Sequence, residues 1–232
     1  MFSNCEFEVV MRAICLDFDG TLVDSEPLHY AAWQEELLPF GLQLAEADYL
    51  AHFCGISTAD TAAALVARHG LPIAADQLKA QKIARFAQLL TRQWPPKVAQ
   101  ADAFLAELSG LGVPLALVTG AYRHEVESVL AHYGWRDYFT LLVTRDEVAQ
   151  GKPHPEPYLQ ACRVLGVTPA MAFTVEDSLT GMQSALAAGL QTLQLQTPYL
   201  GALPEPVANA LCARDSSLMA LASWLAAKVR AN

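Results

Sequence analysis

The sequence has few cationic side chains and no cluster of them. Lys and Arg together number 15 against 24 Asp and Glu, which gives a formal net charge of −9. Nucleic acids and anionic membrane surfaces bind clustered basic residues. We therefore expect no nucleic-acid partner and no membrane partner. An anionic substrate would have to be held locally, by a metal ion and a few cations.

Long apolar runs and paired cysteines are lacking as well. No stretch approaches the roughly 18 apolar residues that a membrane span needs, and the N-terminus lacks the basic and apolar regions of a signal peptide. The five cysteines are odd in number and scattered, with no CxxC pair: Cys5, Cys15, Cys54, Cys162 and Cys212. This usage predicts reduced, mostly buried thiols in a cytoplasmic protein.

The apolar pattern changes twice along the 232 residues, of which 53% are hydrophobic. Residues 28–96 show only helical periodicity, whereas short apolar runs alternate with amphipathic segments after residue 97. Such alternation predicts an α/β fold with a Rossmann-like parallel sheet and helices on both faces. We expect a catalytic core of residues 1–27 and 97–232, with an inserted all-helical cap at 28–96. Residues 1–10 would form a tail or extend the first strand.

The expected strands are short and mostly apolar. A strand over 113–118 tolerates Pro114 because proline is accepted near the start of a strand. Gly189 ends the helix that follows the fourth strand. The strands are expected at 13–16, 113–118, 141–144, 171–175 and 192–195, and a closing helix at 216–229 follows a cap near Asp215.

Two carboxylates follow the first apolar run. Asp17 and Asp19 would point to the same side of an extended strand end. Two carboxylates about 4 Å apart repel by roughly 4 kcal/mol at an effective dielectric constant near 20. Either a cation lies between them or one of them holds a proton. The alternative is that Asp17 and Asp19 are simply two solvated acids at the end of a strand and have no function.

Further polar residues follow the other strands. Thr119 and Gly120 follow the second, Lys152 follows the third through a loop, and Glu176 and Asp177 follow the fourth. In parallel sheets, ligands bind at the carboxyl ends of the strands. The convergence of four carboxylates, a hydroxyl and a lysine at one edge predicts a site for a divalent cation and a phosphate. Mg²⁺ fits, because it prefers a few carboxylates together with phosphate oxygens and water.

Four segments in order resemble the motifs of the haloacid dehalogenase-like hydrolases. The first is Asp-Phe-Asp-Gly-Thr-Leu-Val-Asp, residues 17–24. The others are Leu-Val-Thr-Gly (117–120), Gly-Lys-Pro-His-Pro-Glu-Pro-Tyr (151–158) and Val-Glu-Asp-Ser-Leu-Thr-Gly (175–181). Together they cover nearly the whole chain, and the joint match is highly specific.

The resemblance implies a phosphatase that acts through an aspartyl phosphate. Asp17 would be the nucleophile and Asp19 the general acid and base. Thr119 and Gly120 would bind the phosphoryl oxygens, and Lys152 would pair with the phosphate and with Asp17. The Mg²⁺ ligands would be Asp17, Asp19 through its backbone carbonyl, Glu176 directly or through water, and Asp177.

The resemblance also gives the helical insertion a role. In the family, this position holds a mobile cap that closes over the site and selects the substrate. The segment after Asp24 is similar to the branch with β-phosphoglucomutase and sugar-phosphate phosphatases, so His29, Gly55 and Arg123 are candidate substrate contacts. The mutases usually carry a lysine and an arginine around the cap glycine. Cys54 and Thr58 occupy those positions here, which favours hydrolysis over phosphate transfer.

Each functional interpretation has an ordinary alternative. Thr119 alone is more often a helix cap, a lone lysine is usually solvated, and Glu176 with Asp177 could simply begin a helix. His29 could be an ordinary histidine on a helix face. A phosphosugar mutase and a non-catalytic protein that binds a phosphorylated metabolite remain the two rival functions. We expect a small phosphorylated metabolite as partner, and a monomer or weak dimer.

Overall fold

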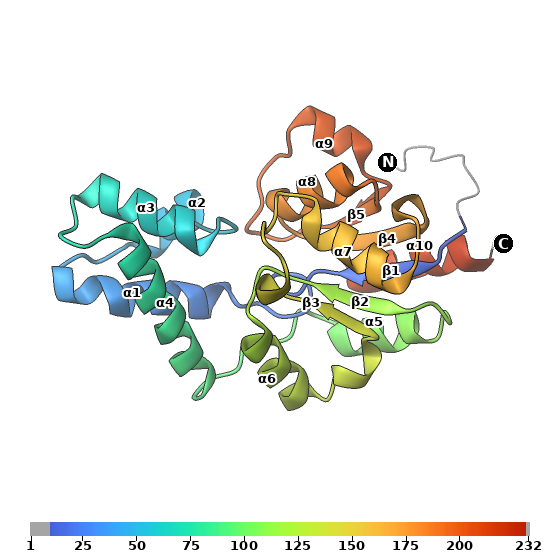
Figure 1. The fold of residues 1–232 in the computed structure, drawn as a ribbon, viewed down its shortest axis with the longest axis horizontal. Coiled ribbons are helices and arrows are strands. Elements are labelled where there is room, and N and C mark those ends of the chain that lie inside the picture. The colour runs from blue at the N-terminus through green and yellow to red at the C-terminus, as the bar shows by residue number, and fades with distance from the viewer. Residues whose placement is uncertain (1–9, 231–232) are drawn as a thin grey trace. The chain divides into compact units, whose positions relative to one another are not determined.

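A computed structural model describes residues 10–230 and contains a six-stranded parallel sheet (Figure 1). The spatial order is β3-β2-β1-β4-β5-β6, and each neighbouring pair runs parallel. Each parallel pair requires a crossover connection, which helices supply. The strands are β1 (Ala13–Leu16), β2 (Leu115–Val118), β3 (Leu141–Val143), β4 (Ala172–Glu176), β5 (Gln191–Leu195) and β6 (Ala213–Asp215).

Helices alternate with these strands, which confirms the predicted α/β class. The core helices are α5 (Ala101–Ser109), α6 (Arg123–Tyr133), α7 (Glu156–Leu165), α8 (Leu179–Ala188), α9 (Glu205–Ala210) and α10 (Leu218–Arg230). Short 3₁₀ turns lie at η2 (Arg136–Tyr138), η3 (Arg145–Glu147) and η4 (Pro169–Met171). A right-handed crossover between parallel strands places each helix on a face of the sheet.

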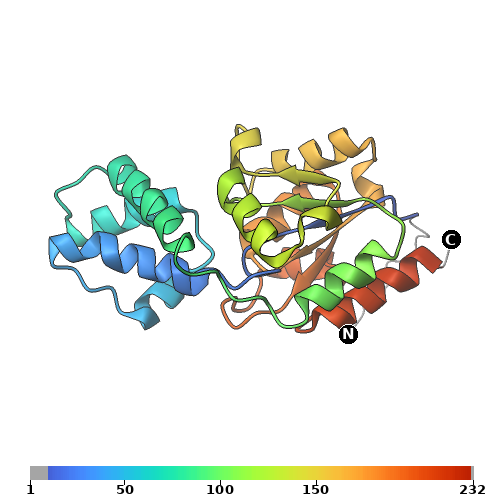
Figure 2. The same ribbon diagram turned by 90° about the horizontal axis from the view of Figure 1, so that it is seen from below.

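The two faces of the sheet can be followed along β4. Ala172 belongs to the buried cluster beneath α7 and α8, whereas the ring of Phe173 packs against that of Trp224 in α10, with centroids 6.0 Å apart. Successive residues of a strand point to opposite faces. Accordingly, α5 and α10 lie side by side on the face away from α7 and α8 (Figure 2).

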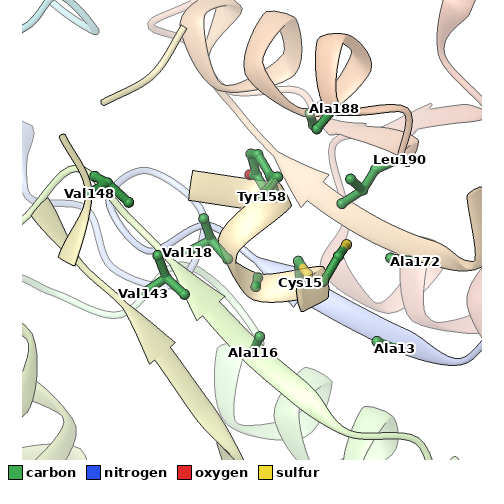
Figure 3. Close-up of a cluster of buried hydrophobic side chains, with 13 residues drawn as sticks. Ala13, Cys15, Ala116, Val118, Val143, Val148, Tyr158, Ala172, Ala188 and Leu190 are labelled. Carbon is green, nitrogen blue, oxygen red and sulfur yellow. The ribbon is translucent and has the colours of Figure 1, made fainter. Parts of the chain in front are cut away.

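The core beneath α7 is built mainly from small side chains. Ala13, Cys15, Ala116 and Val118 project from β1 and β2 toward the helix, and Tyr158 of α7 fills the space above them (Figure 3). Small residues on the strands allow a helix carrying a large aromatic residue to pack closely. This packing fixes α7, and with it the loop that precedes α7.

Some element boundaries differ from the sequence predictions. β2 begins at Leu115 because Pro114 has no N–H to donate, although its carbonyl oxygen accepts a hydrogen bond from Ile14. β6 and α9 were not predicted. β6 has only three residues, too few to show an alternating pattern, and its pairing with β5 depends on tertiary structure.

The chain divides into two compact units, after Asp24 and after Pro96. Within residues 25–96 the regular elements are helices, and the structure shows no strand there. The helices are α1 (Glu26–Leu37), α2 (Glu46–His52), α3 (Thr58–His69) and α4 (Ala75–Leu90), with a 3₁₀ turn at η1 (Leu38–Phe40). Their shared core includes Trp33, Leu37, Leu65 and Leu78.

Two further expectations concern membrane-spanning segments and cysteines. Within residues 10–230, the helices lack the combination of length and apolar character needed to cross a bilayer. Four cysteines in that range are free thiols: Cys15, Cys54, Cys162 and Cys212. Cys5 and most of the expected N-terminal tail or strand extension lie outside the described residues.

Candidate active site

The polar residues expected at the strand ends meet at the carboxyl edge of β1, β2 and β4. Leu16 is in register with Leu117 on one side and Val175 on the other, so the residues that follow these strands begin at the same level. The N–H of Asp17 donates to the carbonyl oxygen of Val175 at 3.1 Å and continues the pairing past β1. The edge of the sheet thus carries side chains from three strands.

Lys152 reaches this edge from the loop before α7. Its ammonium Nζ donates to Asp17 Oδ1 at 2.6 Å, to Glu176 Oε1 at 2.5 Å and to the carbonyl oxygen of Val118 at 2.9 Å. The side chain is 9% exposed. Each of the three ammonium protons has an acceptor at the end of a different strand: β1, β2 or β4. Lys152 therefore links the ends of these strands.

Three carboxylates gather around this lysine. Asp17, Glu176 and Asp177 each offer an oxygen, and these oxygens all lie within 4.8 Å of one another. All three residues are buried. The charge of Lys152 balances only one of them. A buried surplus of negative charge is costly unless a cation or a proton compensates it, and a cluster of hard oxygen atoms suits a divalent cation.

The pKa values of Glu176, Asp177 and Lys152 reflect this surplus of buried negative charge. Burial and the charge of Asp17 raise the pKa of Glu176 to about 7, and burial with the charges of Asp17 and Glu176 raises the pKa of Asp177. Burial alone would lower the pKa of Lys152, but the two adjacent carboxylates outweigh this effect and raise it. Lys152 therefore remains an ammonium ion, and the acids favour an added positive charge.

Two glycines make room for the acids. A Cβ atom at Gly181 in α8 would overlap the carboxylate of Glu176, and one at Gly20 would overlap that of Asp177. Gly20 also has φ of +80°, a left-handed conformation that glycine adopts without steric cost. The carboxylates thus rest directly against the backbone.

Thr119 and Asp19 form a second part of the site. Thr119 Oγ1 donates to Asp19 Oδ2 at 3.4 Å and accepts a hydrogen bond from the N–H of Ala121 at 3.0 Å. The side chain of Asp19 is not among the three clustered carboxylates, because the chain turns after Asp17 and the carbonyl oxygen of Phe18 accepts from Leu22 and Val23. Gly120 follows Thr119 after β2 and is exposed.

α6 begins shortly after Thr119, and the first N–H groups of a helix can bind a phosphate. The N–H of Tyr122 donates instead to Glu125 Oε2 at 3.0 Å, and that of Arg123 donates to Asp146 Oδ2 at 2.7 Å. Carboxylates of the chain itself therefore use these two donors.

A protein-family model matches most of the chain. Residues 14–195 fit the model of the family described as haloacid dehalogenase-like hydrolase. The chain belongs to this family.

Named relatives of this hydrolase include several phosphatases. It is 33% identical over 191 residues to validoxylamine A 7'-phosphate phosphatase from Streptomyces hygroscopicus subsp. limoneus. That alignment covers 81% of the hydrolase and 87% of the relative. It is 30% identical over 183 residues to the fructose-1-phosphate phosphatase of Escherichia coli strain K12, covering 79% and 95%. It spans about half (47%) of a bifunctional riboflavin kinase/FMN phosphatase from Arabidopsis thaliana, at 28% identity over 78% of the hydrolase.

Solved structures share the fold of the hydrolase. CbbY from Rhodobacter sphaeroides in complex with phosphate superposes with a TM-score of 0.77 and 26% sequence identity. The superposition covers 91% of the hydrolase and 96% of that chain. The similarity therefore includes both the sheet and the inserted helices.

Arg123 of the hydrolase is held by acidic partners. Its guanidinium pairs with Glu147, with Nε 2.6 Å from Oε1, and with Glu127 at 3.1 Å. It also donates to the carbonyl oxygen of Leu142 at 3.3 Å. These contacts connect α6 to the segment after β3. Their geometry supports a structural role more directly than the substrate contact we predicted.

Two predicted substrate contacts lie in the helical unit. The ring of His29 stacks on that of Phe86, with centroids 4.2 Å apart, and Nδ1 lies 2.6 Å from Lys82 Nζ. Burial, reinforced by the charge of Lys82, lowers the pKa of His29. The N–H of Gly55 lies 3.4 Å from Glu26 Oε1. His29 is therefore a neutral imidazole within a partly buried contact.

Sequence reasoning missed several residues around the site. The hydroxyl of Tyr158 donates to Glu176, that of Thr21 lies 3.4 Å from Asp177 Oδ1, and that of Ser184 donates to the carbonyl oxygen of His154 at 2.6 Å. Thr21 and Tyr158 stand inside the motif segments, so their hydroxyl groups were a signal that could have been used. Ser184 carried none, because it comes close to His154 only through the packing of α8.

Proposed function

We propose that this hydrolase is a Mg²⁺-dependent phosphatase that cleaves a small phosphorylated metabolite through a phosphorylated Asp17. The observation that carries the proposal is the pairing of the buried Lys152 ammonium with both Asp17 and Glu176, which cluster with Asp177 at the edge of the sheet. This arrangement supports Asp17 as an attacking carboxylate next to a fixed cation, with a site for a second cation beside it. Phosphoryl transfer requires this combination of positioning and charge stabilisation.

The residues present fit Mg²⁺. Asp17, Asp177 and the backbone carbonyl of Asp19 would hold the ion, and Glu176 would contribute directly or through water. Oxygen ligands with room for water and a phosphate oxygen are what Mg²⁺ prefers. When bound, Mg²⁺ would neutralise charge on the attacking carboxylate and on the phosphate, which otherwise repel each other. Asp177 supports this role, because it rests against the backbone of Gly20 and is held in place there.

Each remaining side chain has a task in the proposed reaction. The carboxylate of Asp17 attacks phosphorus and the bond to the leaving oxygen breaks, while Asp19 donates a proton to that oxygen. Asp19 then removes a proton from the water that hydrolyses the phosphorylated Asp17. Thr119 holds a phosphoryl oxygen and keeps Asp19 nearby. Lys152 stabilises negative charge on the transferring group.

A sugar phosphate is the substrate class we propose. Two relatives are named as phosphatases of fructose 1-phosphate and of validoxylamine A 7'-phosphate, and both cover most of this chain. Cys54 and Thr58 supply no second phosphate contact of the kind that the mutases use, which favours hydrolysis. The division of labour between the core and a cap of residues 28–96 remains a prediction, as do a cytoplasmic location and a monomer or weak dimer.

A panel of phosphoesters with Mg²⁺ tests the proposal. We expect release of inorganic phosphate from one or more hexose phosphates, and loss of this activity when the metal is chelated. Conversion of a hexose 1-phosphate to the 6-phosphate without release of phosphate would favour the mutase. A folded protein that is inert toward the whole panel would favour the non-catalytic binding protein.

A further inference from the structure

Tyr158 carries a buried hydroxyl next to the site that the proposed mechanism does not use. The residue is fully buried, and its ring lies among the small side chains of β1 and β2 (Figure 3). A tyrosine hydroxyl in such apolar surroundings must find polar partners. A phenylalanine would fill the same volume without that requirement. Packing alone therefore does not explain why this position carries a hydroxyl group.

The partners of this hydroxyl lie on one face of β4. Tyr158 donates to Glu176 Oε1, and Thr174 Oγ1 lies 3.3 Å from the same hydroxyl. The tyrosine hydroxyl donates to Glu176, and the threonine hydroxyl donates to Tyr158. The hydrogen bonds run in one direction, from Thr174 through Tyr158 to Glu176.

Glu176 Oε1 also accepts a hydrogen bond from Lys152 Nζ at 2.5 Å. Glu176 Oε2 lies 3.3 Å from the hydroxyl of Ser178. Both oxygens of the carboxylate are thus held by donors of the chain, and its back rests against Gly181. Such a carboxylate has little freedom to rotate, so the ammonium it holds is fixed as well.

Lys152 must exchange a partner when a phosphate binds. Its three protons go to Asp17, Glu176 and the carbonyl oxygen of Val118. Asp17 is the partner that bonds to phosphorus in the proposed reaction, so the Lys152 N–H that donates to Asp17 is the one that turns to the phosphate. Glu176 and Val118 then keep the ammonium in place during the exchange.

We propose that Tyr158 is a positioning residue that orients Glu176, so that Glu176 holds Lys152 ready to bind the transferring phosphate. This inference rests on the proposed function and assigns a role to a residue outside the ligand set. Tyr158 acts through Glu176 and touches neither substrate nor metal. Because Tyr158 shares Glu176 Oε1 with Lys152, while Asp17 and Asp177 would hold the ion, its loss should weaken the binding of phosphate more than the binding of Mg²⁺.

The test compares Tyr158→Phe with the wild-type protein and with Tyr138→Phe, a matched control in the 3₁₀ turn η2. Binding of inorganic phosphate is measured by calorimetry at saturating Mg²⁺, and the half-saturating Mg²⁺ concentration by thermal stabilisation. A hydrogen bond to a charged group is worth about a tenfold or larger change in an equilibrium. We expect Tyr158→Phe to weaken phosphate binding about tenfold with a much smaller shift of the Mg²⁺ midpoint, and Tyr138→Phe to match the wild type.

A second pair of variants separates positioning from packing. Thr174→Val removes the hydroxyl that donates to Tyr158 at nearly constant volume, whereas Thr174→Ser keeps it. We expect Ser at this position to retain tighter phosphate binding than Val. Phosphate binding by Tyr158→Phe equal to that of the wild type, or a shift of the Mg²⁺ midpoint as large as the loss of phosphate affinity, would overturn the proposal. A wild type that binds phosphate but hydrolyses no phosphoester would refute the proposed function and leave this test decisive.

Discussion

Gly181→Ala is the substitution for which the structure makes the sharpest prediction. Gly181 lies in the first turns of α8, where alanine is ordinarily the better residue. A Cβ atom at this position would overlap the carboxyl group of Glu176, which is fully buried and bonded to Lys152. Two physical effects therefore oppose each other at this position.

The magnitudes decide which effect wins. Replacing glycine by alanine inside a helix stabilises by about 1 kcal/mol, whereas overpacking a buried site destabilises by about 1–3 kcal/mol. The neighbour that must move is a carboxylate held by hydrogen bonds, so relaxation also weakens its contact with Lys152. We expect a net destabilisation of about 1 kcal/mol, which corresponds to a Tm about 2–4 °C lower. We also expect kcat/KM to fall about tenfold or more.

Thermal unfolding and steady-state hydrolysis of a hexose phosphate measure the two effects. Gly201→Ala is the control, because a Cβ atom at Gly201 would meet no other atom within 4 Å and the φ of Gly201 is not in the left-handed region. This control should stay within about 0.5 kcal/mol of the wild type. A Gly181→Ala protein that is more stable than the wild type and fully active would refute the reasoning, since it would show that Glu176 can move without consequence.

Three further predictions concern the nucleophile, the metal and the pH dependence of stability. Asp17→Asn should lower kcat at least about a thousandfold while circular dichroism remains native, and substantial remaining activity would place the nucleophile elsewhere. Ca²⁺ should inhibit the Mg²⁺-dependent reaction, because its looser coordination spoils the alignment of the reacting groups; equal rates with both ions would contradict the metal site. Hydrogen bonds from Lys97 and Trp135 hold the pKa of Asp102 below its ordinary value. The stability this carboxylate adds should be present above about pH 4 and lost as the pH falls through the lowered value. Unfolding midpoints of the wild type and of Asp102→Asn should therefore differ at pH 6 and converge in acid.

The sequence by itself determined the class of the fold and the positions of most candidate site residues. Short apolar runs predict buried strands, and the acids, the hydroxyl and the lysine that follow them are predicted to lie at the ends of those strands. In a parallel sheet, the ends of neighbouring strands share one edge, so residues distant in sequence can be assigned to the same place. The absence of basic clusters and the helical period of residues 28–96 could also be recognised from the sequence alone. These features depend on local periodicity and on the direction of the chain.

Tertiary structure alone decided which side chains touch. Asp17 and Asp19 stand two residues apart, yet a turn after Asp17 sends one carboxylate to Lys152 and the other to Thr119. The bond between Tyr158 and Glu176 joins a helix to a strand across the core, and no local pattern encodes it. β6 likewise exists only through its pairing with β5. Hydrogen bonds and pKa values depend on distances of a few ångströms between remote segments, and packing sets those distances.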